Sequence, residues 1–206
     1  MSRFASILAT LALTVVLGAT AFAQAGESVR IRGTITSYAA GVLTVQGVAS
    51  SYKVAVPENV RVTWIEKSDL SKIGPNTYIG TVAVPQADGT MRAVEVQVFP
   101  EAMRGVGEGS RPWDSVPNSS MTNATVDTIA ETKVDKIDGR TMTVKYKDGE
   151  KKVFVPANVP VITYVPADKA ALTAGAHVII MATKAADGSY SAPAVNVGRD
   201  GLVPPM

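Results

Sequence analysis

The stretch KVAVPENVRV at residues 53–62 recurs as KVFVPANVPV at residues 152–161, a shift of 99 residues. At the same shift, the turn sequence Ala-Asp-Gly at 87–89 recurs at 186–188. The VPxNVxV pattern inside the block is consecutive and unusual in composition, so chance is a poor explanation for it. The sequence therefore predicts that one unit of the chain has been duplicated.

Each copy has the pattern of a series of short strands, because apolar and polar residues alternate and β-branched residues are frequent. A helical turn is expected at 69–74, with Ser68 or Asp69 as its cap and Gly74 as its end. Further turns are expected at Ala40-Gly41, Asp138-Gly139 and Asp148-Gly149. The expected strands are 29–38, 42–47, 52–56, 60–65, 78–84 and 91–99, then 132–137, 141–146, 152–155, 160–164, 177–183 and 190–197.

Three strands, a short helix and two more strands within about 70 residues are the order of an OB-fold barrel. The predicted fold class is all-β: two tandem small OB-like β-barrels with short helices, joined by an irregular insert. The first barrel would span 24–99, the insert 100–125 and the second barrel 126–206. Another small β-barrel or a β-sandwich is the alternative. Core and wall positions are expected among Val42, Val54, Val56, Val60, Val62, Val94, Val96 and Val98.

The insert, PEAMRGVGEGSRPWDSVPNSSMTNAT, holds three glycines and three prolines, which disfavour both strands and helices. It is nevertheless unlike a plain linker, because charged residues gather here around one of the two tryptophans of the chain. Two interpretations stay open: the insert pins the two barrels in a fixed orientation, or it is an ordered loop that binds a ligand or a partner. The candidate binding residues are Arg104, Glu108, Arg111, Trp113 and Asp114.

Residues 1–23 have the pattern of a secretory signal peptide. Arg3 supplies a short positive region, and an apolar run follows over 7–17. Ala21-Phe22-Ala23 then places small residues before a cleavage point at Gln24. The apolar run is shorter than the roughly 20 residues that a membrane-spanning helix needs. We expect a periplasmic or secreted protein with no membrane span after cleavage.

Two motifs carry a resemblance to a known group of proteins. One is the RGTI…GVLTV opening at 32–35 and 41–45, and the other is the string from Arg104 through RPWD at 111–114 to MTNA at 121–124. Together they resemble a group of small secreted proteins of Gram-negative bacteria with OB-like domains of unknown function, over most of 28–130. The resemblance implies no catalytic residues. Some members of that group are described as metal-transporter permeases, which a chain without further apolar spans does not fit.

Composition excludes several classes of function. The chain has no Cys, one His and a formal net charge of +2, so thiolate metal sites, a Cys nucleophile and multi-His metal sites are ruled out. The near-neutral balance gives no field suited to nucleic acid. A local basic strip remains at Lys145, Lys147, Lys151 and Lys152, and we interpret it as an exposed hairpin whose lysines protect a sheet edge.

No catalytic constellation is visible in the sequence. The single histidine, His177, starts an expected strand and is interpreted as a half-buried strand residue. The glycines at 105–109 lack the spacing of a phosphate-binding loop. We therefore expect an exported, non-enzymatic binding or scaffold module without a cofactor or catalytic residues, whose partner is an unknown protein or envelope component. A periplasmic metal- or small-ligand-binding accessory protein is the alternative, and the oligomeric state stays undetermined.

Overall fold

A computed structural model describes residues 26–134 and 137–205, so the expected signal segment lies outside the described residues. The described chain is all-β, with short 3₁₀ helices and no longer helix. The strands are β1 (Glu27–Ala39), β2 (Val42–Gln46), β3 (Ser51–Ala55), β4 (Arg61–Lys67), β5 (Tyr78–Pro85), β6 (Met91–Val98), β7 (Gly109–Pro112), β8 (Ser120–Val134), β9 (Ile137–Tyr146), β10 (Gly149–Pro156), β11 (Val161–Ala167), β12 (His177–Lys184), β13 (Tyr190–Ser191) and β14 (Ala194–Gly198). The 3₁₀ helices are η1 (Leu70–Lys72), η2 (Glu101–Met103), η3 (Lys169–Ala171) and η4 (Arg199–Gly201).

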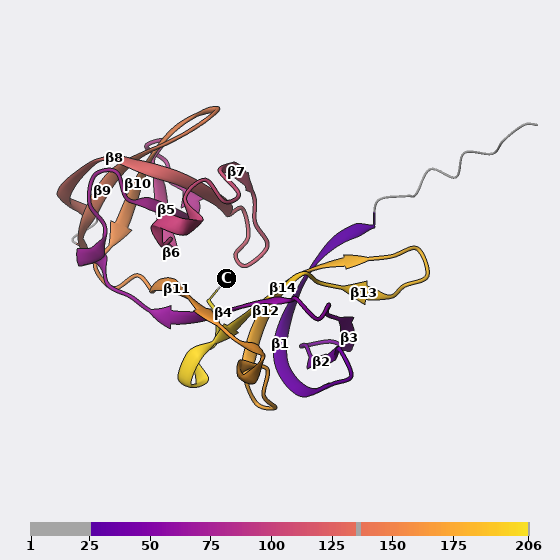
Figure 1. Cartoon of the computed structure of the whole chain (residues 1–206). Helices are drawn as coiled ribbons and strands as arrows, with labels where there is room; N and C mark the ends of the chain where they lie inside the picture. Colours follow the sequence, from indigo (N-terminus) through magenta and orange to yellow (C-terminus); the bar gives the residue numbers. More distant parts are fainter. Residues whose placement is uncertain (1–25, 135–136, 206) are drawn as a thin grey trace, which may run out of the picture.

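The strands pair into two closed rings of five, which form the two lobes in Figure 1. In the first ring, β1 pairs with β2, β2 with β3, β3 with β13, β13 with β12, and β12 with β1. In the second ring, β5 pairs with β6, β6 with β10, β10 with β9, β9 with β8, and β8 with β5. A closed ring leaves no open sheet edge, which is the usual reason for a small barrel to close.

Each ring is built from both halves of the chain. The first ring combines β1–β3 with β12 and β13, and the second combines β8–β10 with β5 and β6. One barrel per repeat, at 24–99 and 126–206, is therefore not confirmed. The last two strands of each predicted repeat complete the ring of the other repeat, and local strand patterns do not specify which copy supplies a pairing partner.

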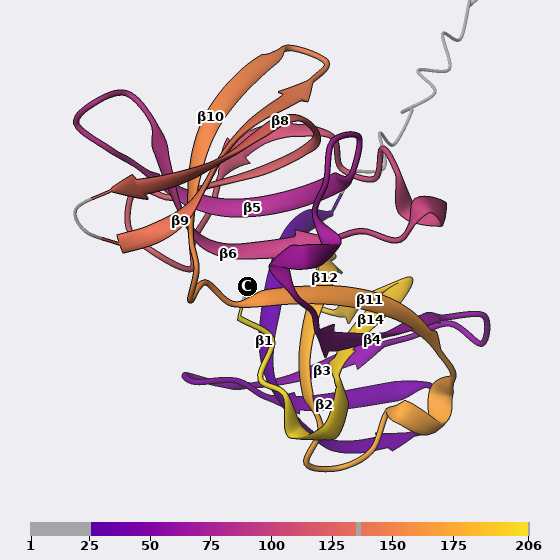
Figure 2. The ribbon, with the colours of Figure 1, turned by 90° about the vertical axis from the view of Figure 1, so that its left-hand side faces the viewer.

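The strands β4 and β11 carry the chain from one ring to the other and back (Figure 2). They pair antiparallel between the lobes, with Ile65 opposite Tyr164. Each also pairs in parallel with a strand of a neighbouring lobe: β4 with β14, where Val62 lies beside Val195, and β11 with β6. The two lobes are thus one continuous hydrogen-bonded sheet.

Three apolar clusters follow from this topology. One fills the first ring, one fills the second, and a third lies between them around Ile65, Phe99 and Tyr164. Of the valines expected in the core, five are buried: Val54, Val56, Val60, Val62 and Val96. Val42 is 37% exposed, because it lies at the start of β2 beside the Ala40-Gly41 turn.

The short helical turn after β4 forms as expected. Asp69 caps η1, and its carboxylate accepts a hydrogen bond from the Ser71 amide at 2.7 Å. Leu70 and Ile73 pack on the apolar cluster of the second ring. Asp168 caps η3 in the same way, with a 2.8 Å hydrogen bond from the Ala170 amide.

The region between the repeats contains more secondary structure than its glycines and prolines predict. It contains η2 and β7, and its last residues, from Ser120, are the start of β8. The segment between the repeats, predicted at 100–125, is therefore shorter in the structure. The insert is residues 100–119, which end where β8 begins. Asp138 and Gly139 lie inside β9 instead of forming a turn, because β8 and β9 pair as far as Val134.

Within 26–134 and 137–205, no helix has the length and apolar character needed to cross a bilayer.

Candidate functional site: the insert and the surfaces that it joins

The insert begins with a turn that is closed by one arginine. Arg104 holds both carboxylate oxygens of Glu101, with Nε to Oε1 at 2.6 Å and Nη2 to Oε2 at 2.8 Å. Its Nη2 also donates to the backbone carbonyl of Asn76 at 2.9 Å. The pKa of the Glu101 carboxyl is lowered, chiefly by the hydrogen bond from Arg104. Arg104 thus ties η2 to the loop before β5.

The next segment, Gly105–Gly109, is held by its backbone. The carbonyl of Val106 accepts hydrogen bonds from the Tyr78 hydroxyl at 3.2 Å and from Asn123 Nδ2 at 3.0 Å. Tyr78 and Asn123 are 2% and 5% exposed, whereas the Val106 side chain is 51% exposed. The three glycines have positive φ angles, which allow the tight path. The fixed backbone therefore presents an apolar side chain to solvent.

One further bond fixes the middle of the insert to the second ring, and another closes the insert on itself. Glu108 accepts a hydrogen bond from the backbone amide of Lys147 at 3.0 Å, in the turn between β9 and β10. Arg111 donates to the carbonyl of Gly107 at 2.8 Å. β7, which contains Arg111, pairs with the first residues of β8.

The end of the insert reaches the first ring. The guanidinium carbon of Arg30 lies 3.5 Å from the ring centroid of Trp113, and that of Arg111 lies 5.7 Å from it. Asp114 pairs with Arg30 at 2.5 Å and with Arg32 at 2.7 Å. The insert is therefore clamped between the second ring and β1 of the first.

Electrostatics at this clamp follow from burial and pairing. The pKa of the Asp114 carboxyl is lowered, first by its hydrogen bond with Arg32 and further by the charges of Arg32 and Arg30. The pKa of Arg30 is lowered by burial, which outweighs the attraction of Asp114. Within the described residues, Arg30 Nε and Trp113 Nε1 are buried without a hydrogen-bond partner. The packing of Arg30 on Trp113 thus leaves two buried N–H donors without an acceptor, which offsets part of its stabilising effect.

A buried polar chain lies between the two rings. Gln97 donates from Nε2 to Glu95 Oε1 at 3.0 Å, and the Tyr164 hydroxyl donates to Gln97 Oε1 at 2.7 Å. Glu95 is 2% exposed, and this burial raises its pKa to about 7. The chain links β6 of the second ring to the crossing strand β11.

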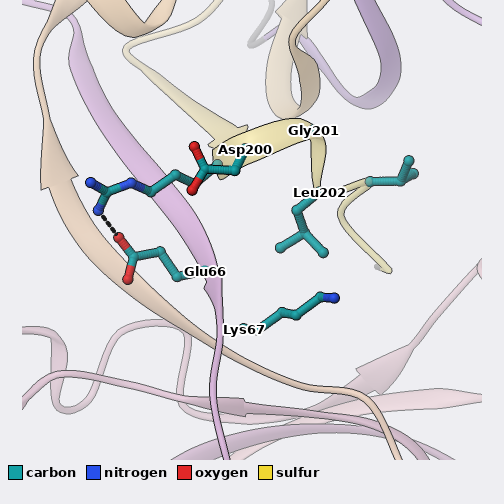
Figure 3. Close-up of a pocket in the computed structure, with 7 residues that line it drawn as sticks. Glu66, Lys67, Asp200, Gly201 and Leu202 are labelled. Carbon is teal, nitrogen blue, oxygen red and sulfur yellow. Dashed lines mark hydrogen bonds and ion pairs between the residues drawn. The ribbon is translucent and has the colours of Figure 1, made fainter.

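Away from the insert, a hollow of about 570 Å³ lies beside the end of β4, near the C-terminal end of the described chain. Glu66 forms an ion pair with Arg199. Figure 3 shows Glu66, Lys67 and Leu202 around the hollow. Its remaining lining comes from Asp200, Gly201 and Val203.

The structure brings three of the five predicted site residues together. Arg111, Trp113 and Asp114 gather at Arg30, whereas Arg104 and Glu108 make separate contacts that fix the insert elsewhere. The sequence does not indicate Arg30 and Arg32, which pair with Asp114, or Tyr78 and Asn123, which hold the Val106 carbonyl. Polar and apolar residues alternate along β1 as in any half-buried strand, so no local signal distinguishes the first two.

The other polar candidates have local partners. His177 starts β12 and is partly buried as expected, with Nδ1 3.1 Å from the Thr34 hydroxyl. Of the basic strip, Lys145 pairs with Asp127 at 3.0 Å. Lys151 is half-buried instead of exposed, and it contacts the insert. Among the residues that the structure describes, no three His, Cys, Asp or Glu side chains are placed to hold a metal ion.

Comparisons with protein-family models, with curated proteins and with solved structures find no match to this chain.

Proposed function

We propose that this chain is an exported, non-enzymatic binding or scaffold module of the periplasm, which recognises a protein or envelope component through the insert. The observation that carries the proposal is the way the insert is held. Buried Tyr78 and Asn123 of the second ring hold its backbone, and Arg30 and Arg32 of the first ring pair with Asp114. The apolar side chain of Val106 is nevertheless 51% exposed. A loop ordered before binding loses less conformational entropy when a partner docks.

The composition of this surface supports recognition of another macromolecule. Arginine and tryptophan are the residues that most often dominate the binding energy of an interface. Here Arg111, Arg30 and Trp113 form one stack whose edge reaches solvent beside the half-exposed Asp114. Arg111 of this stack also donates to the carbonyl of Gly107, the residue after Val106. The exposed side chain of Val106 supplies the apolar component that such interfaces need.

We further propose that both rings are OB-like barrels that arose by duplication and exchanged their last two strands. The order of three strands, a short helix and two strands around each ring supports this. The spacing of the elements supports it too, since η1 begins at Leu70 and η3 at Lys169, a shift of 99 residues. The resemblance to small secreted proteins of Gram-negative bacteria is consistent with the same origin.

Export rests on residues 1–23. If the proposal holds, the protein purified from its native cell begins at Gln24 and fractionates with the periplasm or the medium. A chain that retains Met1 and remains in the cytoplasmic fraction would contradict it.

A photo-crosslinking residue placed at position 106 tests recognition by the insert. Val48 is a matched control, because it is an exposed valine in another loop, between β2 and β3. We expect a discrete adduct from position 106 in living cells and none from position 48. The purified adduct partner should bind the wild-type protein, and binding should weaken by about tenfold in Arg111→Ala, the loss of one charge-assisted contact. Equal adducts at both positions, or equal affinity of the partner for the wild type and for Arg111→Ala, would overturn the proposal.

A periplasmic accessory protein that binds a small ligand is a second candidate, favoured by the hollow between Glu66, Lys67 and Leu202. A screen of small molecules by thermal shift tests it. The expected result is stabilisation that Lys67→Met abolishes and Lys53→Met does not. Stabilisation by no compound, or by compounds that do not require Lys67, would count against this candidate.

A further inference from the structure

One end of the second ring is polar where the same end of the first ring is apolar. In the second ring, Thr81 of β5 lies opposite Thr122 of β8. At the corresponding register of the first ring, Ile180 of β12 lies opposite Ile31 of β1. The fold therefore does not require polar side chains at these positions, since an isoleucine pair fills them in the other lobe.

The same contrast holds at the neighbouring positions. Lys151 pairs with Val144 in the second ring, whereas Tyr52 pairs with Val45 in the first. Likewise Ser120 lies opposite Ala83 in the second ring, and Val29 lies opposite Ala182 in the first. Four positions that are apolar or aromatic around the first ring thus carry a lysine, a serine and two threonines in the second.

Lys151 is the cation of this polar end, and two serine hydroxyls accept hydrogen bonds from it. Lys151 stands two residues before Val153, which is in the core of the second ring, so alternation along β10 directs Lys151 toward the same interior. Its Nζ donates to the Ser110 hydroxyl at 2.7 Å and to the Ser120 hydroxyl at 3.3 Å. Ser110 in turn lies 3.0 Å from the Thr122 hydroxyl. The other end of the ring is closed by η1, where Arg140 donates to the Leu70 carbonyl at 2.9 Å.

The ammonium of Lys151 is incompletely satisfied. It has three N–H donors, of which the serines use two, and among the described residues no carboxylate pairs with it. Burial lowers its pKa, and no neighbouring charge offsets the effect. The buried hydroxyl of Thr81 also lacks a partner within the described chain. A half-buried cation surrounded by hydroxyl groups is stabilised by an anion.

Access to this end is open from the side of the insert. Ser110 and Ser120 line a hollow of about 410 Å³ together with Arg111, Asn118 and Ser119. The two serines that accept hydrogen bonds from Lys151 are thus among the residues that line this hollow. Arg111 and Asn118 add a second cation and an amide to the lining.

We propose that the end of the second ring at Lys151 binds a small oxyanion, a phosphate or a carboxylate group, through the lysine ammonium and the hydroxyls of Ser110 and Ser120. The proposal does not depend on recognition of a partner by Val106.

Titration of the full mature protein with inorganic phosphate, and separately with acetate, tests the site by calorimetry and by NMR at constant ionic strength. We expect saturable binding of at least one of the two anions, and which one binds distinguishes phosphate from carboxylate chemistry. The amide signals of Ser110, Ser120 and Lys151 should shift together, while that of Lys152 should not. Absence of saturable binding for both anions would overturn the proposal.

A matched pair of variants separates the site from general charge. Lys151→Met and Lys152→Met remove the same charge from neighbouring residues, but Lys152 is exposed. We expect Lys151→Met to weaken anion binding by roughly tenfold or more, as loss of a charge-assisted hydrogen bond does, and Lys152→Met to leave it unchanged. Equal binding by the two variants would contradict the assignment.

Lys151→Tyr keeps the test valid if the methionine variant folds poorly. Tyrosine occupies the corresponding position of the first ring, as Tyr52, so the barrel accommodates it there. This variant should fold and lose the anion. Retention of binding in a folded Lys151→Tyr protein would show that the lysine is not the ligand.

Discussion

Ile65 lies opposite Tyr164 where β4 and β11 pair, and these two positions are related by the 99-residue shift of the sequence repeat. Each crossing strand thus meets its own counterpart at the centre of the molecule. The parallel pairs obey the same relation, since Val62 lies beside Val195 and Val161 beside Val96. The two halves are therefore related by an approximate two-fold axis through this pair, as in an isologous dimer whose subunits have been joined.

Cutting the insert should not release two domains. With a protease site introduced between Ser115 and Val116, the cleaved chain should still elute as one species from size exclusion. The reason is that each ring contains strands from both fragments. We expect the fragments to part only in denaturant, in one cooperative transition. Two independently folded fragments after cleavage under native conditions would contradict the strand exchange.

Asp114→Asn should weaken the clamp between the insert and β1. The variant leaves Arg30, whose side chain is only 15% exposed, without its carboxylate partner, so we expect a loss of about 1 kcal/mol in urea unfolding. Because its pKa is lowered in the folded state, Asp114 stabilises the protein above its unfolded pKa, and this contribution disappears as the pH falls through the folded value.

Glu101→Gln is the matched control for this clamp, because it removes the carboxylate of another ion pair in the same insert. The Glu101 side chain is 77% exposed. Solvent and salt screen such a pair, so its loss should leave the unfolding midpoint nearly unchanged. An equal effect of both substitutions would show that the Arg30 contact has no special weight.

Glu95→Gln should flatten the pH dependence of stability. Burial raises the pKa of Glu95 from 4.5 to about 7, so the folded protein holds this proton more tightly than the unfolded chain. The contribution of this carboxyl to the free energy of unfolding is full below about pH 4.5 and is lost as the pH rises to about 7. The total change in the free energy of unfolding is about 3 kcal/mol. Glutamine cannot ionise and still accepts from Gln97, so the variant should be more stable than the wild type at pH 8.

Denaturant midpoints measured from pH 4 to pH 8 check this expectation, with Tyr164→Phe as a comparison. That variant removes the hydroxyl that donates to Gln97 and should cost about 1 kcal/mol at every pH in this range. If Glu95→Gln instead lowers stability equally at all pH values, the carboxyl is ionised throughout, and the proposed proton linkage is wrong.

Gly33→Ala should be strongly destabilising. An added Cβ at Gly33 would lie 2.2 Å from the backbone carbonyl oxygen of Gln46, where β1 and β2 pair, and backbone cannot move aside as a side chain can. Gly74→Ala meets nothing within 4 Å and serves as the control. Thermal unfolding should give a clear drop for the first variant and little change for the second.

Much of the fold is predictable because its causes are local. The alternation of apolar and polar residues along 91–98 favours a strand whichever strands it later pairs with. The Asp69 carboxylate caps its helical turn by accepting a hydrogen bond from the amide two residues further along the chain. The pairing of rings is different. Both copies present the same alternating pattern, so β3 could pair with β6 or with β13, and strand propensity does not distinguish the two partners.

The candidate site shows the same division. Composition alone singled out Trp113 and Asp114, because a tryptophan between a proline and an aspartate is out of place in a linker. Their partner Arg30 lies far away in the sequence, within β1, and nothing near it in the chain marks it. Lys151 was misread as an edge lysine, since its burial depends on Ser110 and Ser120 of other strands.

The all-β class, the capped helical turn after β4 and the Ala40-Gly41 turn follow from the sequence alone, because alternation, capping and glycine conformations act over a few residues. The turn predicted at Asp138-Gly139 was wrong, because pairing with β8 extends β9 through it. The half that completes each ring, the residues that clamp the insert and the lysine that faces a polar interior are seen in the folded chain alone. Those outcomes depend on the side chains that long-range pairing brings together, as Ile65 and Tyr164 are brought together at the crossing of β4 and β11.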